Sequence, residues 1–199
     1  MVGTGENRCE KDKGAVTSLA FDHEFSRLLV GCTDGHVRLY NYGNGLLLKR
    51  YALKSPADIS GLCSAFEAGE VLLYAGTESA EVYMWKDTEE STTLRPIAHD
   101  RLNTSAHELD VSCIVHVPPD YLITCSFDGR VVVWQRGVLK HSLTDPTWAD
   151  RPIMSVRMCP FVPSDHSDVK RLLLARACVS VDAHALVCWR IAISCAHLL

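Results

Sequence analysis

A hairpin that ends in an aromatic residue recurs along the chain, and this repeat constrains the fold more than any other feature. Three copies align around the same tight turn and a fourth has a degraded turn. They read LLVGCTDGHVRLY at 28–40, VLLYAGTESAEVYMW at 71–85, YLITCSFDGRVVVW at 121–134 and ACVSVDAHALVCW at 177–189. The closing aromatic residues are 45, 49 and 55 positions apart. Repetition at such a period indicates one supersecondary unit that is used several times.

Each hairpin is flanked by further apolar runs of strand length. Asp34-Gly35 and Asp128-Gly129 suit the tight turn, because glycine tolerates positive φ and aspartate bonds its own backbone. A strand is expected before each hairpin, at Val16–Phe21, Ile59–Ala65, Val111–Val117 and Ile153–Met158. Another is expected after it, most clearly at Leu46–Ala52 and Val138–Leu143. The polar stretches 87–110 and 161–170 are expected to be exposed loops.

From about Gly14 to Ile191, these units resemble the repeats of the tryptophan–aspartate (WD) family. The resemblance implies an all-β fold, a partial β-propeller of about four four-stranded antiparallel WD-type blades. Their expected bounds are 14–52, 57–97, 107–143 and 152–195, after a flexible segment at 1–13. Propellers close with 4–8 blades, and segment 1–13 offers no closing strand. We therefore expect the blades not to close on their own, and further blades from a longer chain or a partner to complete the ring.

The same resemblance assigns a structural hydrogen-bond network to the third copy. In the WD family a histidine, a serine or threonine, an aspartate and a tryptophan are joined, and these positions correspond to His107, Ser126, Asp128 and Trp134. A buried imidazole, hydroxyl and indole each need a partner, which gives the network a physical reason. The other copies keep single members of the network, which are Asp34, Tyr40 in place of tryptophan, Trp85 and Trp189.

Three alternatives based on chemistry are weaker than these structural interpretations. His107, Ser126 and Asp128 supply the residue types of a hydrolase triad, but no Gly-x-Ser-x-Gly motif surrounds the serine. Asp165, His166 and Asp168 offer metal-ligand types on what is expected to be a solvated loop. The nine cysteines are odd in number and include no CxxC pair, which favours reduced, packed thiols over disulfides or zinc. We therefore expect no catalytic site, no metal and no cofactor.

Charge and hydropathy exclude several classes of partner. The chain carries 20 basic and 24 acidic residues, a formal charge of −4, so it lacks the positive field that attracts nucleic acid or anionic membranes. No apolar run approaches the ~20 residues of a membrane-spanning helix. The N-terminal sequence lacks the apolar core of a signal peptide, which predicts a cytoplasmic protein.

The remaining hypothesis is a non-catalytic scaffold that binds other proteins through its loops. The candidate partner-binding residues are Phe127, Trp148, Asp150 and Arg151, because tryptophan and arginine are frequent in binding hot spots. The phrase DVSCIVHVPPDYLITCSFDGRVVVW also resembles large WD-repeat proteins of motile cilia and flagella. That resemblance implies an alternative, a cytoskeletal component of the axoneme. A propeller hydrolase is the other alternative.

Overall fold

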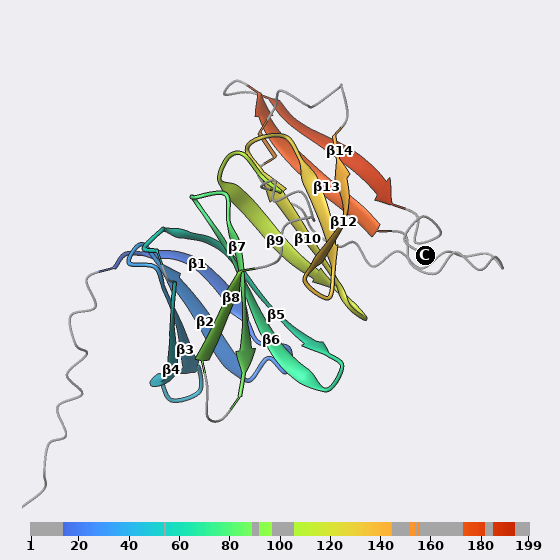
Figure 1. Ribbon diagram of the computed structural model, residues 1–199. Coiled ribbons are helices and arrows are strands. Elements are labelled where there is room, and N and C mark those ends of the chain that lie inside the picture. Colours follow the sequence, from blue (N-terminus) through green and yellow to red (C-terminus); the bar gives the residue numbers. More distant parts are fainter. Residues whose placement is uncertain are drawn as a thin grey trace, which may run out of the picture.

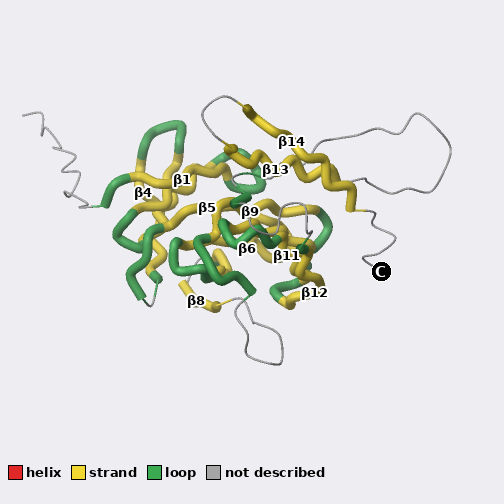
Figure 2. The backbone as a smooth tube through the Cα atoms, turned by 90° about the horizontal axis from the view of Figure 1, so that it is seen from above, coloured by secondary structure: helices red, strands yellow, loops and turns green. Residues whose placement is uncertain are grey.

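The computed structural model describes residues 14–53, 55–88, 92–96, 106–144, 152–153, 155, 173–181 and 185–193. Their regular secondary structure is entirely β-strand, in three four-stranded antiparallel sheets and one two-stranded hairpin (Figures 1 and 2). The prediction of an all-β, repeated fold is confirmed. Within these ranges no helix has the length and apolar character needed to cross a membrane.

Strands follow chain order within every sheet. The first sheet contains β1 (Val16–Phe21), β2 (Arg27–Cys32), β3 (His36–Asn41) and β4 (Leu46–Ala52). The second contains β5 (Ile59–Glu67), β6 (Glu70–Thr77), β7 (Val82–Asp87) and β8 (Thr92–Pro96). The third contains β9 (Val111–Val117), β10 (Tyr121–Ser126), β11 (Val131–Gln135) and β12 (Val138–Leu143). The hairpin pairs β13 (Leu173–Val181) with β14 (Ala185–Ile193).

One sequence expectation needs correction. Stretch 87–110 is not only loop, because Thr92–Pro96 pairs with β7 as the fourth strand of its sheet. The fourth blade is described only as the β13–β14 hairpin, and most of the expected strand Ile153–Met158 lies outside the described residues. The expected loop at 161–170 and the segment 1–13 lie outside the described residues.

A repeated hydrogen bond joins the first strands of neighbouring sheets. The donors are the hydroxyl groups of the bulged second residues of β1, β5 and β9, which are Thr17, Ser60 and Ser112. The acceptors are the carbonyl groups at the start of the next unit, which belong to Ile59, Val111 and Ile153. The bond from Thr17 Oγ1 to Ile59 O measures 2.5 Å. Ile153 therefore occupies the starting position of a fourth blade, although no strand is described there.

Apolar clusters fill the joints between the sheets. One contains Leu29 and Leu39 of the first sheet together with Leu73 and Trp85 of the second. A second joins the facing sides of the second and third sheets around Trp134. A third covers the other side of the third sheet and includes Ile153. Burial between sheets is thus the main source of stability, since the hydrophobic effect scales with the apolar area removed from water.

Exposure of equivalent residues locates the open side of the molecule. Ile59, Val111 and Ile153 are 0% exposed, whereas Val16, at the same position of the first sheet, is 60% exposed. Leu19 is 61% exposed, while its equivalents Leu62 and Ile114 are 8% and 6% exposed. Within the described residues the first sheet is covered on one side only, and the ring is not closed.

Gly76 packs directly against Val111 of the third sheet, so Gly76→Ala is expected to destabilise the fold. A Cβ atom at Gly76 would lie 2.5 Å from Val111 Cγ1, too close for any side chain. Overpacking of this kind costs about 1–3 kcal/mol, which urea unfolding would measure. Gly43→Ala is the matched control, because its Cβ would meet only Asn41 Oδ1 at 3.3 Å. Equal losses in both variants would contradict the close joint.

Candidate functional site

A buried hydrogen-bond network lies in the third sheet. Trp134 Nε1 donates to Thr124 Oγ1 at 2.9 Å, and Thr124 Oγ1 lies 2.7 Å from His107 Nε2. His107 Nδ1 lies 3.4 Å from Asp128 Oδ2. The indole only donates, so the threonine hydrogen is free to point at Nε2. A neutral imidazole with its proton on Nδ1, facing Asp128, satisfies this chain.

The hydroxyl of the network belongs to Thr124, and the prediction that Ser126 supplies it is wrong. Trp134 pairs with Leu122, so Thr124 is one same-face position away and Ser126 is two, beyond the reach of the indole. Ser126 instead closes the turn, donating to Leu109 O at 2.8 Å and accepting from Asp128 N at 3.1 Å. Counting the hairpin register back from the Asp-Gly turn would have identified Thr124 from the sequence.

Asp128 anchors the network from the turn. Burial alone would raise the pKa of Asp128, but hydrogen bonds from His107 and from the backbone of Glu108 and Arg130 outweigh it and hold the pKa below its ordinary value. Its Oδ2 accepts from Glu108 N and its Oδ1 from Arg130 N, each at 2.8 Å. The carboxylate therefore connects the loop before β9 to the β10–β11 turn.

The first and second sheets carry different residues at the positions of this network. The positions equivalent to Thr124 are Val30 and Ala75, which carry no hydroxyl. In the first sheet Asp34 accepts a 2.5 Å bond from Arg38 Nη2, and this guanidinium holds the pKa of Asp34 below its ordinary value. Tyr40 is half-buried on β3. In the second sheet Trp85 is 1% exposed and packs 5.9 Å from Tyr51, measured between ring centroids.

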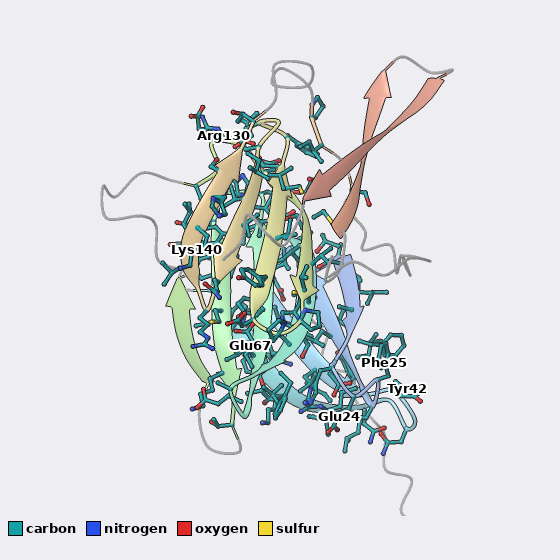
Figure 3. All side chains as sticks on the ribbon, turned by 90° about the vertical axis from the view of Figure 1, so that its right-hand side faces the viewer. Glu24, Phe25, Tyr42, Glu67, Arg130 and Lys140 are labelled. Atoms are coloured by element: carbon teal, nitrogen blue, oxygen red, sulfur yellow. The ribbon has the colours of Figure 1, made fainter. Side chains whose placement is uncertain are left out.

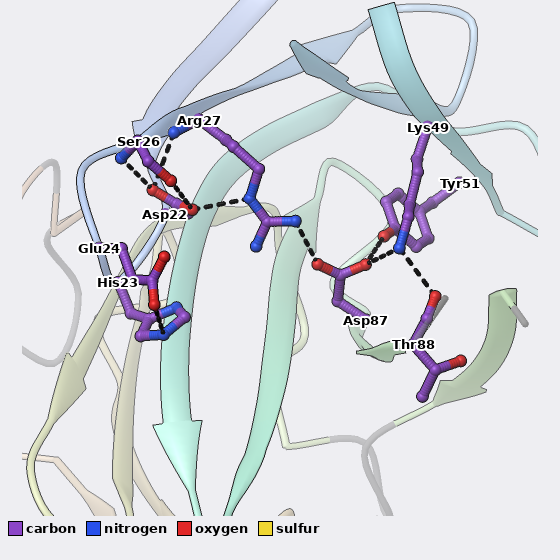
Figure 4. Close-up of polar contacts among 9 residues, drawn as sticks. All are labelled: Asp22, His23, Glu24, Ser26, Arg27, Lys49, Tyr51, Asp87 and Thr88. Atoms are coloured by element: carbon purple, nitrogen blue, oxygen red, sulfur yellow. Dashed lines mark hydrogen bonds and ion pairs between the residues drawn. The ribbon is translucent and has the colours of Figure 1, made fainter. Parts of the chain in front are cut away.

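An ionic cluster that sequence reasoning missed joins the first two sheets (Figure 4). Asp87, at the end of β7, accepts from Lys49 Nζ and Tyr51 OH at 2.6 Å each and from Arg27 Nη1 at 2.7 Å. Arg27 Nε in turn donates to Asp22 Oδ2 at 2.8 Å. Burial alone would raise the pKa of Asp87, but these three donors and the charge of Arg27 lower it. In the sequence, the carboxylate of Asp87, two residues after Trp85, could have indicated this cluster.

A cleft of about 300 Å³ lies where the first strands begin, and we call it the strand-start cleft. Its lining includes Glu78, Asp110 and Phe127, beside the hydroxyl-bearing residues of the three first strands. Glu78 N donates to Asp58 O at 3.0 Å and Phe127 N to Asp110 O at 3.1 Å. The equivalent residue of the first sheet is Thr33, whose N donates to Ala15 O at 2.9 Å. One backbone arrangement thus presents three chemically different side chains.

Comparisons with known proteins agree with this geometry. The profile of the WD domain, G-beta repeat, matches residues 7–41 and 100–135, which include the first and third hairpins. The Denticleless protein homolog of Mus musculus is 25% identical over 183 residues, covering 86% of this chain and 24% of that protein. A crystal structure of the mitotic checkpoint complex superposes with a TM-score of 0.61 at 18% identity, covering 83% of this chain and 45% of the matched chain.

The first and third repeats of the chain are thus WD-type repeats by their match to this profile. The chain spans about a quarter of the length of the curated relative and less than half of the structural neighbour. Its all-β architecture of unclosed, antiparallel blades is that of a partial WD propeller.

The remaining predicted residues of the chain fall into two groups. Trp148, Asp150 and Arg151, expected to form a partner-binding patch, lie outside the described residues, as does the Asp165, His166 and Asp168 group. Trp189 stands on β14 opposite Ala177. Among the described residues no three histidine, cysteine, aspartate or glutamate side chains are grouped to hold a metal ion.

Thr124→Val is expected to destabilise this WD-repeat fold by about 2–4 kcal/mol, because it leaves the Trp134 indole and the His107 imidazole without their shared partner. The free energy of unfolding in urea measures the loss. Thr124→Ser keeps the hydroxyl and serves as the control. A cost as large for Thr124→Ser as for Thr124→Val would show that the hydroxyl bonds are not what matters.

The Asp87 cluster predicts a loss of stability in acid. Because the pKa of folded Asp87 lies below its ordinary value of 3.8, its contribution is complete above about 3.8 and disappears as the pH falls through the folded pKa. Asp87→Asn should cost about 1.5–3 kcal/mol at neutral pH and flatten the decline of unfolding free energy below pH 4. Parallel pH profiles for the two proteins would contradict this role.

Proposed function

We propose that this chain is a non-catalytic scaffold that binds segments of other proteins across the strand-start cleft. The supporting observation is the equivalence of Thr33, Glu78 and Phe127, which occupy one backbone position in three sheets and differ in chemistry. A rigid frame that carries variable side chains around a hollow is the arrangement expected of a recognition surface. The matched chain in the mitotic checkpoint complex belongs to a multiprotein assembly, which supports the general class.

The side chains of the strand-start cleft suit a protein ligand. Phe127 is half-buried and offers an apolar contact, while Glu78 is exposed and Asp110 is half-buried. Among the residues described as lining the cleft, none is lysine or arginine. The cleft therefore favours partner surfaces that combine an apolar residue with hydrogen-bond donors.

Completion of the ring belongs to the same proposal. The exposed face of the first sheet, with Val16 and Leu19, matches faces that are buried in the next two sheets. Further WD blades, from a longer chain or a partner, supply the covering sheet. The axonemal alternative and the cytoplasmic location stay predictions from the sequence.

The hydrolase alternative loses its geometric basis. Ser126 is 0% exposed and bonds to backbone groups of the turn, while His107 bonds to Thr124. A triad requires the serine hydroxyl to meet the histidine. The three residue types thus serve the fold of the third sheet.

A double variant, Phe127→Ala with Glu78→Lys, tests the proposed scaffold function. Affinity capture of the tagged chain from cells, quantified by mass spectrometry, should lose a defined set of partners by about tenfold or more, equivalent to about 1.4 kcal/mol. Lys140→Glu, on the exposed outer strand β12, is the surface-charge control. Thermal unfolding of all three proteins checks that folding is unchanged. An identical partner set for wild type and double variant would refute binding at this cleft.

A further inference from the structure

A second, larger cleft opens where the first strands end, and we call it the strand-end cleft. It has a volume of about 760 Å³ and is lined by the last residues of β1, β5 and β9 and by the turns that follow them. Figure 3 shows Glu24, Phe25 and Glu67 toward this end of the sheets, away from Arg130. Its size is that of a ligand pocket rather than a packing defect.

Two polar atoms of residues that line this cleft are buried without a hydrogen-bond partner. They are His23 Nδ1 and Ser64 Oγ. A buried polar group without a partner is costly, so two beside one hollow point to a ligand. His23 Nε2 lies 3.7 Å from Glu24 Oε1. A proton on that nitrogen leaves Nδ1 as a hydrogen-bond acceptor.

Two exposed phenylalanine rings stand at the rim. Phe25 is 71% exposed and Phe66 is 54% exposed, and Phe66 stacks on His23 with 5.4 Å between ring centroids. Phe25 also adopts a φ of 56°, in the left-handed region that bulky side chains avoid. Its ring centroid lies 6.1 Å from that of Phe21. Strained outliers of this kind cluster at binding sites.

The charges around the strand-end cleft are acidic. Among its described lining residues there is no lysine or arginine, and Asp22 is already bonded to Arg27. Glu24 is exposed beside His23, and Glu67, 5% exposed, accepts from Tyr74 OH at 2.9 Å and lies 3.4 Å from His116 Nε2. A cationic ligand is therefore favoured over an anionic one.

We propose that the strand-end cleft binds an arginine side chain of a partner protein. A planar guanidinium stacks on aromatic rings, here Phe25 and Phe66, and presents several donors, which His23 Nδ1 and Ser64 Oγ accept. Glu24, which is exposed beside His23, supplies the opposing charge. The site lies at the other end of the first strands from the strand-start cleft. An experiment can therefore refute binding at one cleft without refuting binding at the other.

The test uses the 199-residue chain and three peptides that differ at one central residue in a Gly-Ser frame: arginine, lysine or citrulline. Citrulline keeps the shape of arginine and lacks its charge. Titrations followed by ¹H–¹⁵N NMR should place the shifts at residues 21–26, 63–68 and 114–119. The arginine peptide should bind at least about tenfold more tightly than the citrulline peptide, about 1.4 kcal/mol, with lysine between them.

Two variants separate a binding role from a structural one. Phe25→Asn relieves the left-handed strain and Ser64→Ala removes an unpaired hydroxyl, so both should leave the urea unfolding midpoint unchanged or raised. Both should weaken binding of the arginine peptide by about tenfold or more, about 1.4 kcal/mol. Val138→Ser, at a residue 55% exposed on β12, is the control and should change neither quantity.

Several results would overturn the proposal. Equal binding of the citrulline peptide would mean an apolar groove without charge recognition. Shifts confined to Glu78, Asp110 and Phe127 would place the arginine in the strand-start cleft instead. A lower unfolding midpoint for Ser64→Ala would give Ser64 a structural role, and absence of saturable binding at millimolar peptide would remove the site.

Discussion

A sheet of this kind needs a neighbour on each face, and that requirement governs the structure. The joints between sheets repeat three elements: a bulge hydroxyl that donates to the next unit, an apolar first residue that is fully covered, and a small residue where the backbones approach. Gly31 and Gly76 meet Ile59 and Val111 at these points. The hydroxyl bonds fix the register, and the apolar burial around them supplies most of the stability.

The hydrogen-bond network of the third sheet is not what makes a blade. The first and second sheets lack a hydroxyl at the position of Thr124, yet they form the same four strands. Asp34 is bonded to Arg38 and lies beside His36, and the Asp87 cluster ties the first sheet to the second through Arg27 and Lys49. The architecture therefore does not require this particular network, and polar anchoring differs from sheet to sheet.

The sequence predicted the architecture well because hairpins with Asp-Gly turns and closing aromatics carry local information. It predicted the site less well, because the residues involved meet only through register and packing. Ser126 and Thr124 face the same side of β10, and only the pairing of Trp134 with Leu122 separates them. The strand-end cleft brings His23, Ser64 and His116 together from three units. No spacing in the sequence predicts that these residues line one cleft.

Ile153 shows how such a chain can be assembled. It is fully covered and its carbonyl is held by Ser112, although no strand partner of its own unit is described beside it. Each folded sheet thus provides a packing position for the first residue of the next sheet. A polypeptide emerging from the ribosome can add sheets in order of synthesis, each templated on the one before, without waiting for its distant end.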